Sequence, residues 1–468
     1  MWQGRRPILY LLFLSLIVHA GVVLAVYHSA GSIDAYAFNS LDSHEYYQIA
    51  KNVATHGVFS QSIEPPLVPD TWRTPGYSLF LAIGMLLGCD SPSSLVIVQQ
   101  LLSVLNVLLF FLVTRLSMSP PRATIAAALF LLEPYHLYYS LWLMATTLFV
   151  TVLLLAWYAW QTALARRGCI WWVGLGMLCG LLVIIRPVGI LVPAVVLAGL
   201  AWCMVARRGR GPAPNSRRLS WVHLVVYALA NAAVLMPWTV RNQIVAGNFA
   251  LSDQGGVVLA YFKATEVVLW RAGRTADRYL ETSLNPADAN APHPVWEAID
   301  AQLRQALPGL TPAQAAELRW ANLAQGNKTS VDSFEISRAL GRIGWSYLAA
   351  APLSTVACGL TRCASILTFP LNLAFDPPSD RPVNRGRALL LAGPYVVLVG
   401  GVLFALVRRR ASFVGAFYPL GVVLALLLAT TPQIDPRFRV PLIPMLVFVA
   451  LLPSMRAESN TATRERTC

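Results

Sequence analysis

Runs of apolar residues, each long enough to cross a bilayer as a helix, recur along most of this chain. A transmembrane helix needs at least about 17 mainly apolar residues, and about ten runs reach that length. They lie at residues 8–27, 92–116, 121–139, 141–164, 169–185, 188–206, 219–238, 389–407, 412–430 and 436–453. The pattern predicts an all-α polytopic membrane protein, a bundle of about ten transmembrane helices.

Two further apolar stretches are expected to lie at the membrane surface or to re-enter it without crossing. Residues 76–88 are too short to span, and residues 344–369 are interrupted by Pro352, Arg362 and Pro370. If neither stretch crosses the membrane, the remaining helices alternate in direction and all the arginine-rich connections fall on one side.

The arginines between the apolar runs predict the orientation of the bundle. They fall at Arg5, Arg6, Arg115, Arg122, Arg166, Arg167, residues 207–218, residues 408–410 and Arg456. Because basic residues favour the cytoplasmic side, we expect the chain to cross the plasma or inner membrane many times, with both termini in the cytoplasm. Residues 28–91 and 239–388 then face the exterior or periplasm, where we expect the chemistry to occur.

Composition supports this class and excludes others. Apolar residues make up 56% of the chain and charged residues 12%, and the net charge of +14 comes mostly from the arginines assigned to the cytoplasm. The sequence has no basic patch with interleaved aromatic residues, so it does not predict a nucleic-acid partner. The seven cysteines are scattered and no Cys or His spacing predicts a zinc site. Phosphate-binding loops, dinucleotide fingerprints and metalloprotease motifs are also missing from the sequence.

Four parts of the chain follow from these patterns. Residues 1–260 form an N-terminal transmembrane catalytic module, residues 261–388 a small extracytoplasmic cap with interfacial helices, residues 389–455 the C-terminal transmembrane helices, and residues 456–468 a cytoplasmic tail. Within the cap, helices are expected near 294–306 and 312–324.

The first outward segment carries acidic residues at the start of an amphipathic helix. Residues 40–56 place apolar side chains at helical spacing, and Asp42, His44 and Glu45 precede them. Asp42 and Glu45 either cap this helix or accept a proton in catalysis. The two roles are compatible, because a carboxylate in the first turn stays at the accessible helix end.

Arginines stand where apolar segments meet water, close to proline turns. They are Arg73 before Thr-Pro-Gly, Arg241 after Pro-Trp, and Arg437 and Arg439 at the start of the last span. An arginine at this depth is costly unless it holds an anion, and lipid phosphates are the anions found there. These residues are therefore candidates for binding a lipid phosphate, although arginines also extend to head groups without a specific role.

Glu133 and Arg186 close the third and fifth spans at the outer boundary. With His44 they are candidates for a second acidic or acceptor-binding site. The structural alternative is that Arg186 neutralises Glu133 across the bundle.

Taken in order, the motifs resemble a known family. They read D-S-x-E-Y after the first span, R-T-P-G-Y before a short helix, I-R-P in the fifth span, P-W-x-x-R-N after the seventh and R-F-R-x-P-x-x-P at the last. From Arg5 to Pro453 this series resembles the family 39 type of glycosyltransferase within the GT-C superfamily. That family includes protein O-mannosyltransferases and the aminoarabinose transferases of lipid A.

The resemblance implies a reaction and roles for individual residues. A sugar would pass from a polyprenyl-phosphate donor to a lipid, glycan or protein acceptor at the outer face of the bilayer, with inversion. Asp42 matches the family's base and Arg73 the cation that meets the donor phosphate, with Arg241, Arg437 and Arg439 as further phosphate contacts. No cofactor is implied with certainty, and whether a divalent metal ion assists is left open. The family's second acidic residue is missing from residues 144–149, where Glu133 or Glu45 would have to substitute.

Three other functions remain open from the sequence. A transporter or flippase of lipid-linked or anionic substrates would show internal repeats and charges at the bilayer midplane, whereas here the charges gather at the outer rim. A ligase or polymerase of surface polysaccharides would use the same lipids. A non-catalytic scaffold predicts that Asp42, Arg73 and Arg437 lie far apart.

Overall fold

The computed structural model describes residues 5–166, 168–206, 220–273, 294–312, 333–368, 385–407, 413–431 and 436–452, and within these ranges the secondary structure is helical. Three predicted features lie outside them: the arginine runs at 207–218 and 408–410, the tail at 456–468, and all but the start of the expected helix at 312–324.

Most helices follow the predicted apolar runs, with two corrections: the expected span 121–139 is divided into two helices at residues 132–133, and the expected span 436–453 holds only a short turn and a nine-residue helix. In chain order they are α1 (Arg5–Ala30), α2 (Asp34–Ala37), α3 (Leu41–His56), α4 (Pro75–Leu86), α5 (Pro92–Arg115), α6 (Pro120–Leu131), α7 (Pro134–Tyr139), α8 (Thr146–Arg166), α9 (Cys169–Ile185), η2 (Pro187–Ile190), α10 (Leu191–Ala206), α11 (Trp221–Ala246), α12 (Gln254–Val257), the π-helix η3 (Val258–Ala264), α13 (Thr265–Arg271), α15 (Pro294–Ala306), α17 (Ser333–Ala349), α18 (Pro352–Thr368), α20 (Arg385–Val407), α21 (Phe413–Thr430), η5 (Pro436–Phe438) and α22 (Ile443–Leu451).

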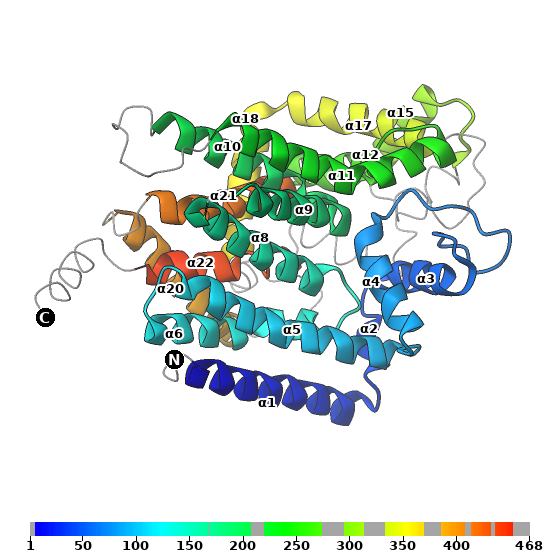
Figure 1. The fold of residues 1–468 in the computed structure, drawn as a ribbon. Helices are drawn as coiled ribbons and strands as arrows, with labels where there is room; N and C mark the ends of the chain where they lie inside the picture. The colour runs from blue at the N-terminus through cyan, green and yellow to red at the C-terminus, as the bar shows by residue number, and fades with distance from the viewer. Residues whose placement is uncertain are drawn as a thin grey trace, which may run out of the picture.

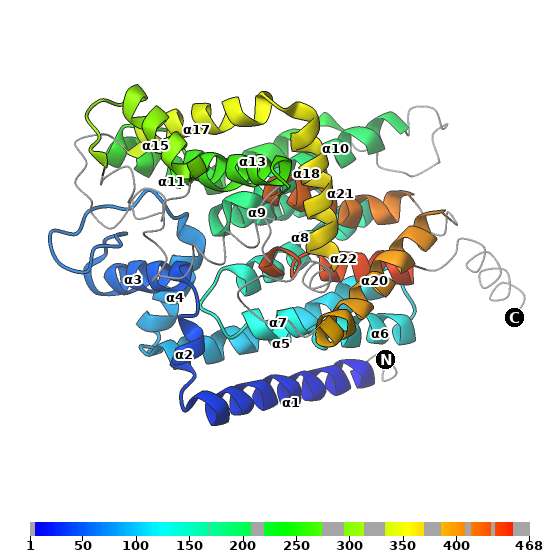
Figure 2. The same cartoon turned by 180° about the vertical axis from the view of Figure 1, so that it is seen from behind.

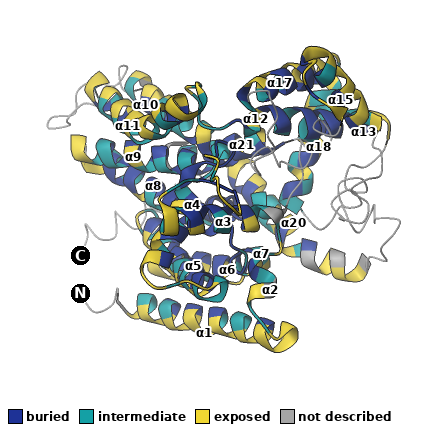
Figure 3. Ribbon diagram, turned by 90° about the vertical axis from the view of Figure 1, so that its right-hand side faces the viewer, coloured by how far each residue is buried: buried dark blue, intermediate teal, exposed yellow. Residues whose placement is uncertain are grey.

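Long helices run side by side and form the body of the molecule (Figure 1). The centre is formed by α5, α8, α9, α21 and α22, and α1 lies along one edge, where most of its surface is exposed (Figure 3). Large aromatic side chains fill the interior, among them Phe110, Trp157, Tyr418 and Phe448. Helices α3 and α4 lie at one end of the bundle, and the first residues of α1 lie at the other (Figures 1 and 2).

Within the described ranges, five helices are long and apolar enough to cross a membrane. They are Arg6–Ala30, Pro92–Arg115, Thr146–Arg166, Pro187–Val205 and Trp221–Ala246. A sixth span arises if α17 and α18, which are bent by 96° at their junction, count as one. The chain is a multi-pass membrane protein, and the count of about ten helices stays a prediction.

The two apolar stretches excluded from the predicted spans are helical, and their not crossing the membrane stays a prediction. Residues 76–86 belong to α4, a short apolar helix at the end of the bundle, and residues 344–368 hold the end of α17 and all of α18, which form a bent pair. A bend of this size fits a broken span or a re-entrant hairpin. Pro352, at the start of α18, accounts for the break, because proline cannot continue a helix and restricts the residue before it.

Helices α12, η3, α15 and α17 form a cap with a hydrophobic core of its own (Figure 2). Tyr261, Trp296, Ile336 and Leu340 are buried in this core, and Trp72 from the first outer loop packs among them. The cap is therefore attached to the loop that carries Arg73.

Close backbone packing joins the start of the cap to α17. A Cβ atom placed on Gly256 would lie 1.8 Å from the carbonyl oxygen of Ser337, whereas one on the adjacent Gly255 would meet nothing within 4 Å. We expect Gly256→Ala to destabilise the cap by about 1–3 kcal/mol or more, because backbone atoms must move apart. Thermal unfolding in detergent measures this, with Gly255→Ala as the matched control. Equal melting temperatures for the two variants would contradict the packing described.

Candidate active site

Helix α3 begins two residues earlier than a cap at Asp42 would require. Ser40 is the N-cap residue, in extended conformation and without a side-chain cap hydrogen bond, and Asp42 lies in the first helical turn. The capping interpretation of Asp42 and Glu45 is therefore wrong. Their carboxylates instead bind arginines from distant parts of the chain.

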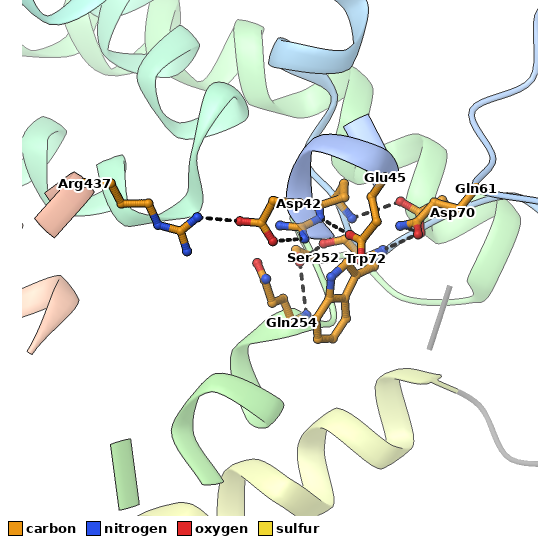
Figure 4. Close-up of polar contacts among 9 residues, drawn as sticks. Asp42, Glu45, Gln61, Asp70, Trp72, Ser252, Gln254 and Arg437 are labelled. Atoms are coloured by element: carbon orange, nitrogen blue, oxygen red, sulfur yellow. Dashed lines mark hydrogen bonds and ion pairs between the residues drawn. The ribbon is translucent and has the colours of Figure 1, made fainter. Parts of the chain in front are cut away.

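Asp42 lies between two guanidinium groups (Figure 4). Arg73 Nη2 donates to Asp42 Oδ1 at 2.6 Å, and Arg437 Nη1 donates to Asp42 Oδ2 at 2.8 Å. Burial disfavours the charged carboxylate, but Arg73 and Arg437 outweigh that effect and hold the pKa of Asp42 well below its ordinary value. Asp42 is thus ionised, and its side chain keeps 25% of its surface exposed.

Arg73 is shared between two carboxylates. Its Nε donates to Glu45 Oε2 at 2.6 Å, and its guanidinium lies 5.0 Å from the centre of the Tyr46 ring. Burial raises the pKa of Glu45, an effect that Arg73 opposes and the charge of Asp42 reinforces. Despite burial, the pKa of Arg73 is raised because both acids favour its charged form. The guanidinium is held in one orientation, beside Asp42.

Asp70 organises the turn that presents Arg73. Its side chain accepts from the main-chain N–H groups of Trp72, at 3.3 Å, and Arg73, at 3.0 Å. Gln61 Nε2 also donates to Asp70 Oδ1 at 3.2 Å (Figure 4). This Asx-type turn then passes into α4, whose first residue is Pro75. The sequence analysis did not select Asp70, although an Asp three residues before Arg73 is the spacing of such a turn.

Burial raises the pKa of Asp70 from 3.8 to about 7. Between these values the folded protein binds a proton that the unfolded chain has lost, so this residue makes stability fall as pH rises from about 4 to about 7. We expect Asp70→Asn to reduce the pH dependence of the free energy of unfolding by up to one proton. The variant should also be less stable overall, because one hydrogen-bond acceptor is lost. Melting temperatures at pH 5 and pH 8 measure this. An unchanged difference between the two pH values would show that Asp70 does not titrate there.

The short turn η5 brings Arg437 to the cluster from the other end of the chain. Phe438 follows it, and the guanidinium groups of Arg437 and Arg186 each lie 5.5 Å from the centre of the Phe438 ring. Arg186 Nη1 donates to Thr146 Oγ1 at 3.3 Å, within the segment where the resemblance expects an acidic residue. Arg186 therefore lies beside the cluster.

Arg439 and Glu133 lie deeper in the bundle, away from Asp42. Arg439 is fully buried, with its guanidinium 3.6 Å from the centre of the Tyr395 ring and 4.5 Å from that of Tyr135. Arg439 Nη2 lies 3.9 Å from Glu133 Oε1, which also accepts from the Tyr395 hydroxyl, and Glu133 caps α7. Glu133 is paired with Arg439, and not with Arg186 as the structural alternative supposed.

Arg241 and His44 have other surroundings. Arg241 Nη1 donates to the carbonyl of Asp70 at 2.5 Å, and its guanidinium lies 4.7 Å from the centre of the Trp238 ring. It therefore supports the loop before Arg73. His44 is exposed and stacks on Phe38 with a centroid distance of 4.5 Å.

Asp42, Arg73 and Arg437 thus meet at hydrogen-bond distance although they lie far apart in sequence. The scaffold alternative predicted that they would be separated, and this geometry counts against it. Within the described ranges, no group of three His, Cys, Asp or Glu side chains lies close enough to hold a metal ion.

Comparisons with known proteins agree with the motif order. Residues 72–238 match the sequence model of the family described as dolichyl-phosphate-mannose-protein mannosyltransferase. Comparison with curated protein sequences gives no match. The fold is similar to the apo oligosaccharyltransferase of Archaeoglobus fulgidus, with a TM-score of 0.50 and 17% identity, covering 100% of this chain and 52% of that one. This chain thus spans about half the length of that protein.

A second similar structure is ArnT from Cupriavidus metallidurans bound to undecaprenyl phosphate, with a TM-score of 0.39 and 16% identity, covering 96% of this chain and 79% of that one. The family match and the fold of the archaeal enzyme confirm the resemblance to GT-C glycosyltransferases.

Proposed function

We propose that this chain, whose residues 72–238 match the family described as dolichyl-phosphate-mannose-protein mannosyltransferase, moves a sugar from a polyprenyl-phosphate donor to an acceptor at the outer face of the membrane. The observation that carries the proposal is the position of Asp42 between Arg73 and Arg437. The carboxylate of Asp42 provides a base, and the two guanidinium groups within a few ångströms of it provide a site for the phosphate.

These three side chains can carry the central step. Asp42 accepts the proton of the acceptor hydroxyl, whose oxygen attacks the anomeric carbon of the donor sugar from the face opposite the phosphate. The bond between the anomeric carbon and the phosphate oxygen breaks, and its electron pair stays on the phosphate. Arg73 and Arg437 stabilise the charge that develops there, and polyprenyl phosphate leaves. A single displacement of this kind inverts the anomeric configuration.

The low pKa of Asp42 in the free protein fits this sequence of events. A strongly paired carboxylate is a weak base, because two arginines stabilise its charge. A bound donor phosphate would compete for the same guanidinium groups and raise the pKa of Asp42. The base would then become effective only when the donor is present.

The arrangement of the bundle also supports an outer site. Helix α3 lies at the end opposite the start of α1, so a cytoplasmic start of α1 would place Asp42 at the exterior or periplasmic side (Figure 1). The cap, which contacts the Arg73 loop through Trp72, would cover the acceptor's approach. We propose that residues 261–388 select the lipid, glycan or protein acceptor.

Transfer in proteoliposomes tests the function. Purified protein is supplied with labelled polyprenyl-phosphate sugars and with extracts containing lipid, glycan or protein acceptors. We expect label to move to one acceptor class from one or few donors, and Arg437→Gln to reduce transfer. Movement of the lipid across the bilayer without transfer to any acceptor would contradict the proposal and support the transporter alternative.

A further inference from the structure

A neutral polar side chain faces Asp42 from the cap side. Gln254 is the first residue of α12, and Figure 4 shows its carboxamide directed toward Asp42. The main-chain N–H of Gln254 donates to Ser252 Oγ at 3.1 Å, but within the described part of the chain its carboxamide makes no hydrogen bond. The side chain is half-buried.

The segment that carries Gln254 is fixed on both sides. Ser252 Oγ donates to the carbonyl of Trp72 at 2.6 Å, and Thr71 Oγ1 donates to Asp253 Oδ2 at 2.9 Å. After Gln254, the N–H of Gly256 donates to Ser337 Oγ at 3.1 Å. The carboxamide is therefore held in place by the Arg73 loop and by the cap, which is how preorganised binding groups are supported.

A second polar group nearby also lacks a protein partner. The indole nitrogen of Trp72 is buried without a hydrogen bond among the described residues, and the side chain is 1% exposed. Trp72 directly precedes Arg73, and its carbonyl accepts from Ser252. Because nearly all buried polar groups in native proteins are hydrogen-bonded, an unsatisfied one in the loop that carries Arg73 is a second available hydrogen-bond donor in this region.

The chemistry of an amide indicates which part of a ligand it meets. A carboxamide is neutral, donates through its nitrogen and accepts through its oxygen, so it suits hydroxyl groups and adds no charge to balance a phosphate. The donor sugar is bonded directly to the phosphate, so its hydroxyls must lie beside the Asp42–Arg73–Arg437 cluster. We propose that Gln254 hydrogen-bonds the hydroxyl groups of the donor sugar and thereby helps to determine which sugar is transferred. This inference rests on the proposed function.

Equilibrium binding to detergent-solubilised full-length protein tests the inference. The probes are polyprenyl phosphates carrying mannose, glucose, galactose or arabinose, together with polyprenyl phosphate without a sugar. Loss of neutral hydrogen bonds should raise the Kd of the best sugar-bearing lipid about 10-fold in Gln254→Ala and leave the Kd of the sugar-free lipid unchanged. The preference among the four sugars should shrink by a similar factor. The exposed Gln243 provides the matched control Gln243→Ala, which should bind all lipids as the wild type does.

Each alternative outcome has a definite meaning. If the wild type binds both kinds of lipid and Gln254→Ala weakens both equally, or neither, the role of Gln254 in sugar recognition is refuted while the proposed function stands. A rise in the KM for the acceptor alone would also refute it, because the residue would then face the acceptor. If the wild type binds no polyprenyl phosphate of any kind, both the proposed function and this inference fail. The melting temperature of Gln254→Ala serves as the control for correct folding. It should equal that of the wild type, because the truncated side chain makes no hydrogen bond among the described residues.

Discussion

Asp42→Asn is expected to lower the rate of sugar transfer by about 10²- to 10⁴-fold, the usual contribution of a positioned general base. Asparagine has nearly the same size as aspartate and can still accept a hydrogen bond from Arg73 or Arg437, but it cannot accept the acceptor's proton. The loss should therefore appear in kcat and not in donor affinity. Initial rates at saturating donor and acceptor, with protein amounts matched, measure it.

The matched control for this variant is Asp90→Asn. Asp90 is an exposed acid of the same outer segment, and the structure records only its main-chain carbonyl in a hydrogen bond, from Tyr47. We expect its replacement to leave the rate unchanged. If Asp42→Asn keeps more than about a tenth of the wild-type rate, the base is another residue, and Glu45 becomes the first candidate because it lies on the same helix.

Arg73→Gln is expected to have the largest effect on stability, a loss of about 3–5 kcal/mol, because it leaves the buried carboxylate of Glu45 without its cation and Asp42 with only Arg437. The side chains of Arg73 and Glu45 are only 7% and 8% exposed, so water cannot replace the lost contact. Transfer should fall as well, since the donor phosphate loses one of its two cations. Thermal unfolding in detergent and transfer by the remaining folded protein measure the two effects separately.

A second substitution distinguishes lost pairing from general damage. Adding Glu45→Gln to Arg73→Gln removes the charge that was left buried, and it should restore part of the stability but none of the transfer. Arg271→Gln, at an exposed residue in the last turn of α13, is the matched control and should have little effect. An unchanged melting temperature for Arg73→Gln would mean that the ion pairs contribute nothing to the fold.

Much of the architecture could be predicted from the chain, because the bilayer requires long apolar helices. The expected helix at residues 40–56 forms as α3, and the short apolar stretch before residue 88 forms α4. The helical spacing of apolar residues identified the first element, and the length of an apolar stretch identified the second. Neither pattern could show that α17 and α18 meet at 96°.

The site was predictable in part. The motif order placed Asp42, Arg73 and Arg437 on the same side of the membrane, and the structure brings them into contact. Sequence spacing could not separate Arg437 from Arg439, because the direction of each side chain is set by the turn at η5. One faces Asp42 and the other is buried beside Glu133.

Residues that act through long-range contacts were missed or placed differently. Arg241 was expected near a phosphate, yet its guanidinium binds the carbonyl of Asp70, a residue 171 positions earlier. Gln254 was not among the predicted site residues. Its importance depends on contacts with the loop of Trp72, and no local pattern records such contacts.

The measurement that tests the central claim most directly is the affinity of the protein for sugar-free polyprenyl phosphate and for the corresponding polyprenol. If Arg73 and Arg437 form a lipid-phosphate site, the phosphate should improve binding to the wild type, and Arg437→Gln should remove most of that gain. Asp42→Asn should bind polyprenyl phosphate at least as tightly as the wild type, because both arginines no longer share a charged carboxylate. Equal affinity for the two lipids, or loss of phosphate binding in Asp42→Asn, would contradict the account.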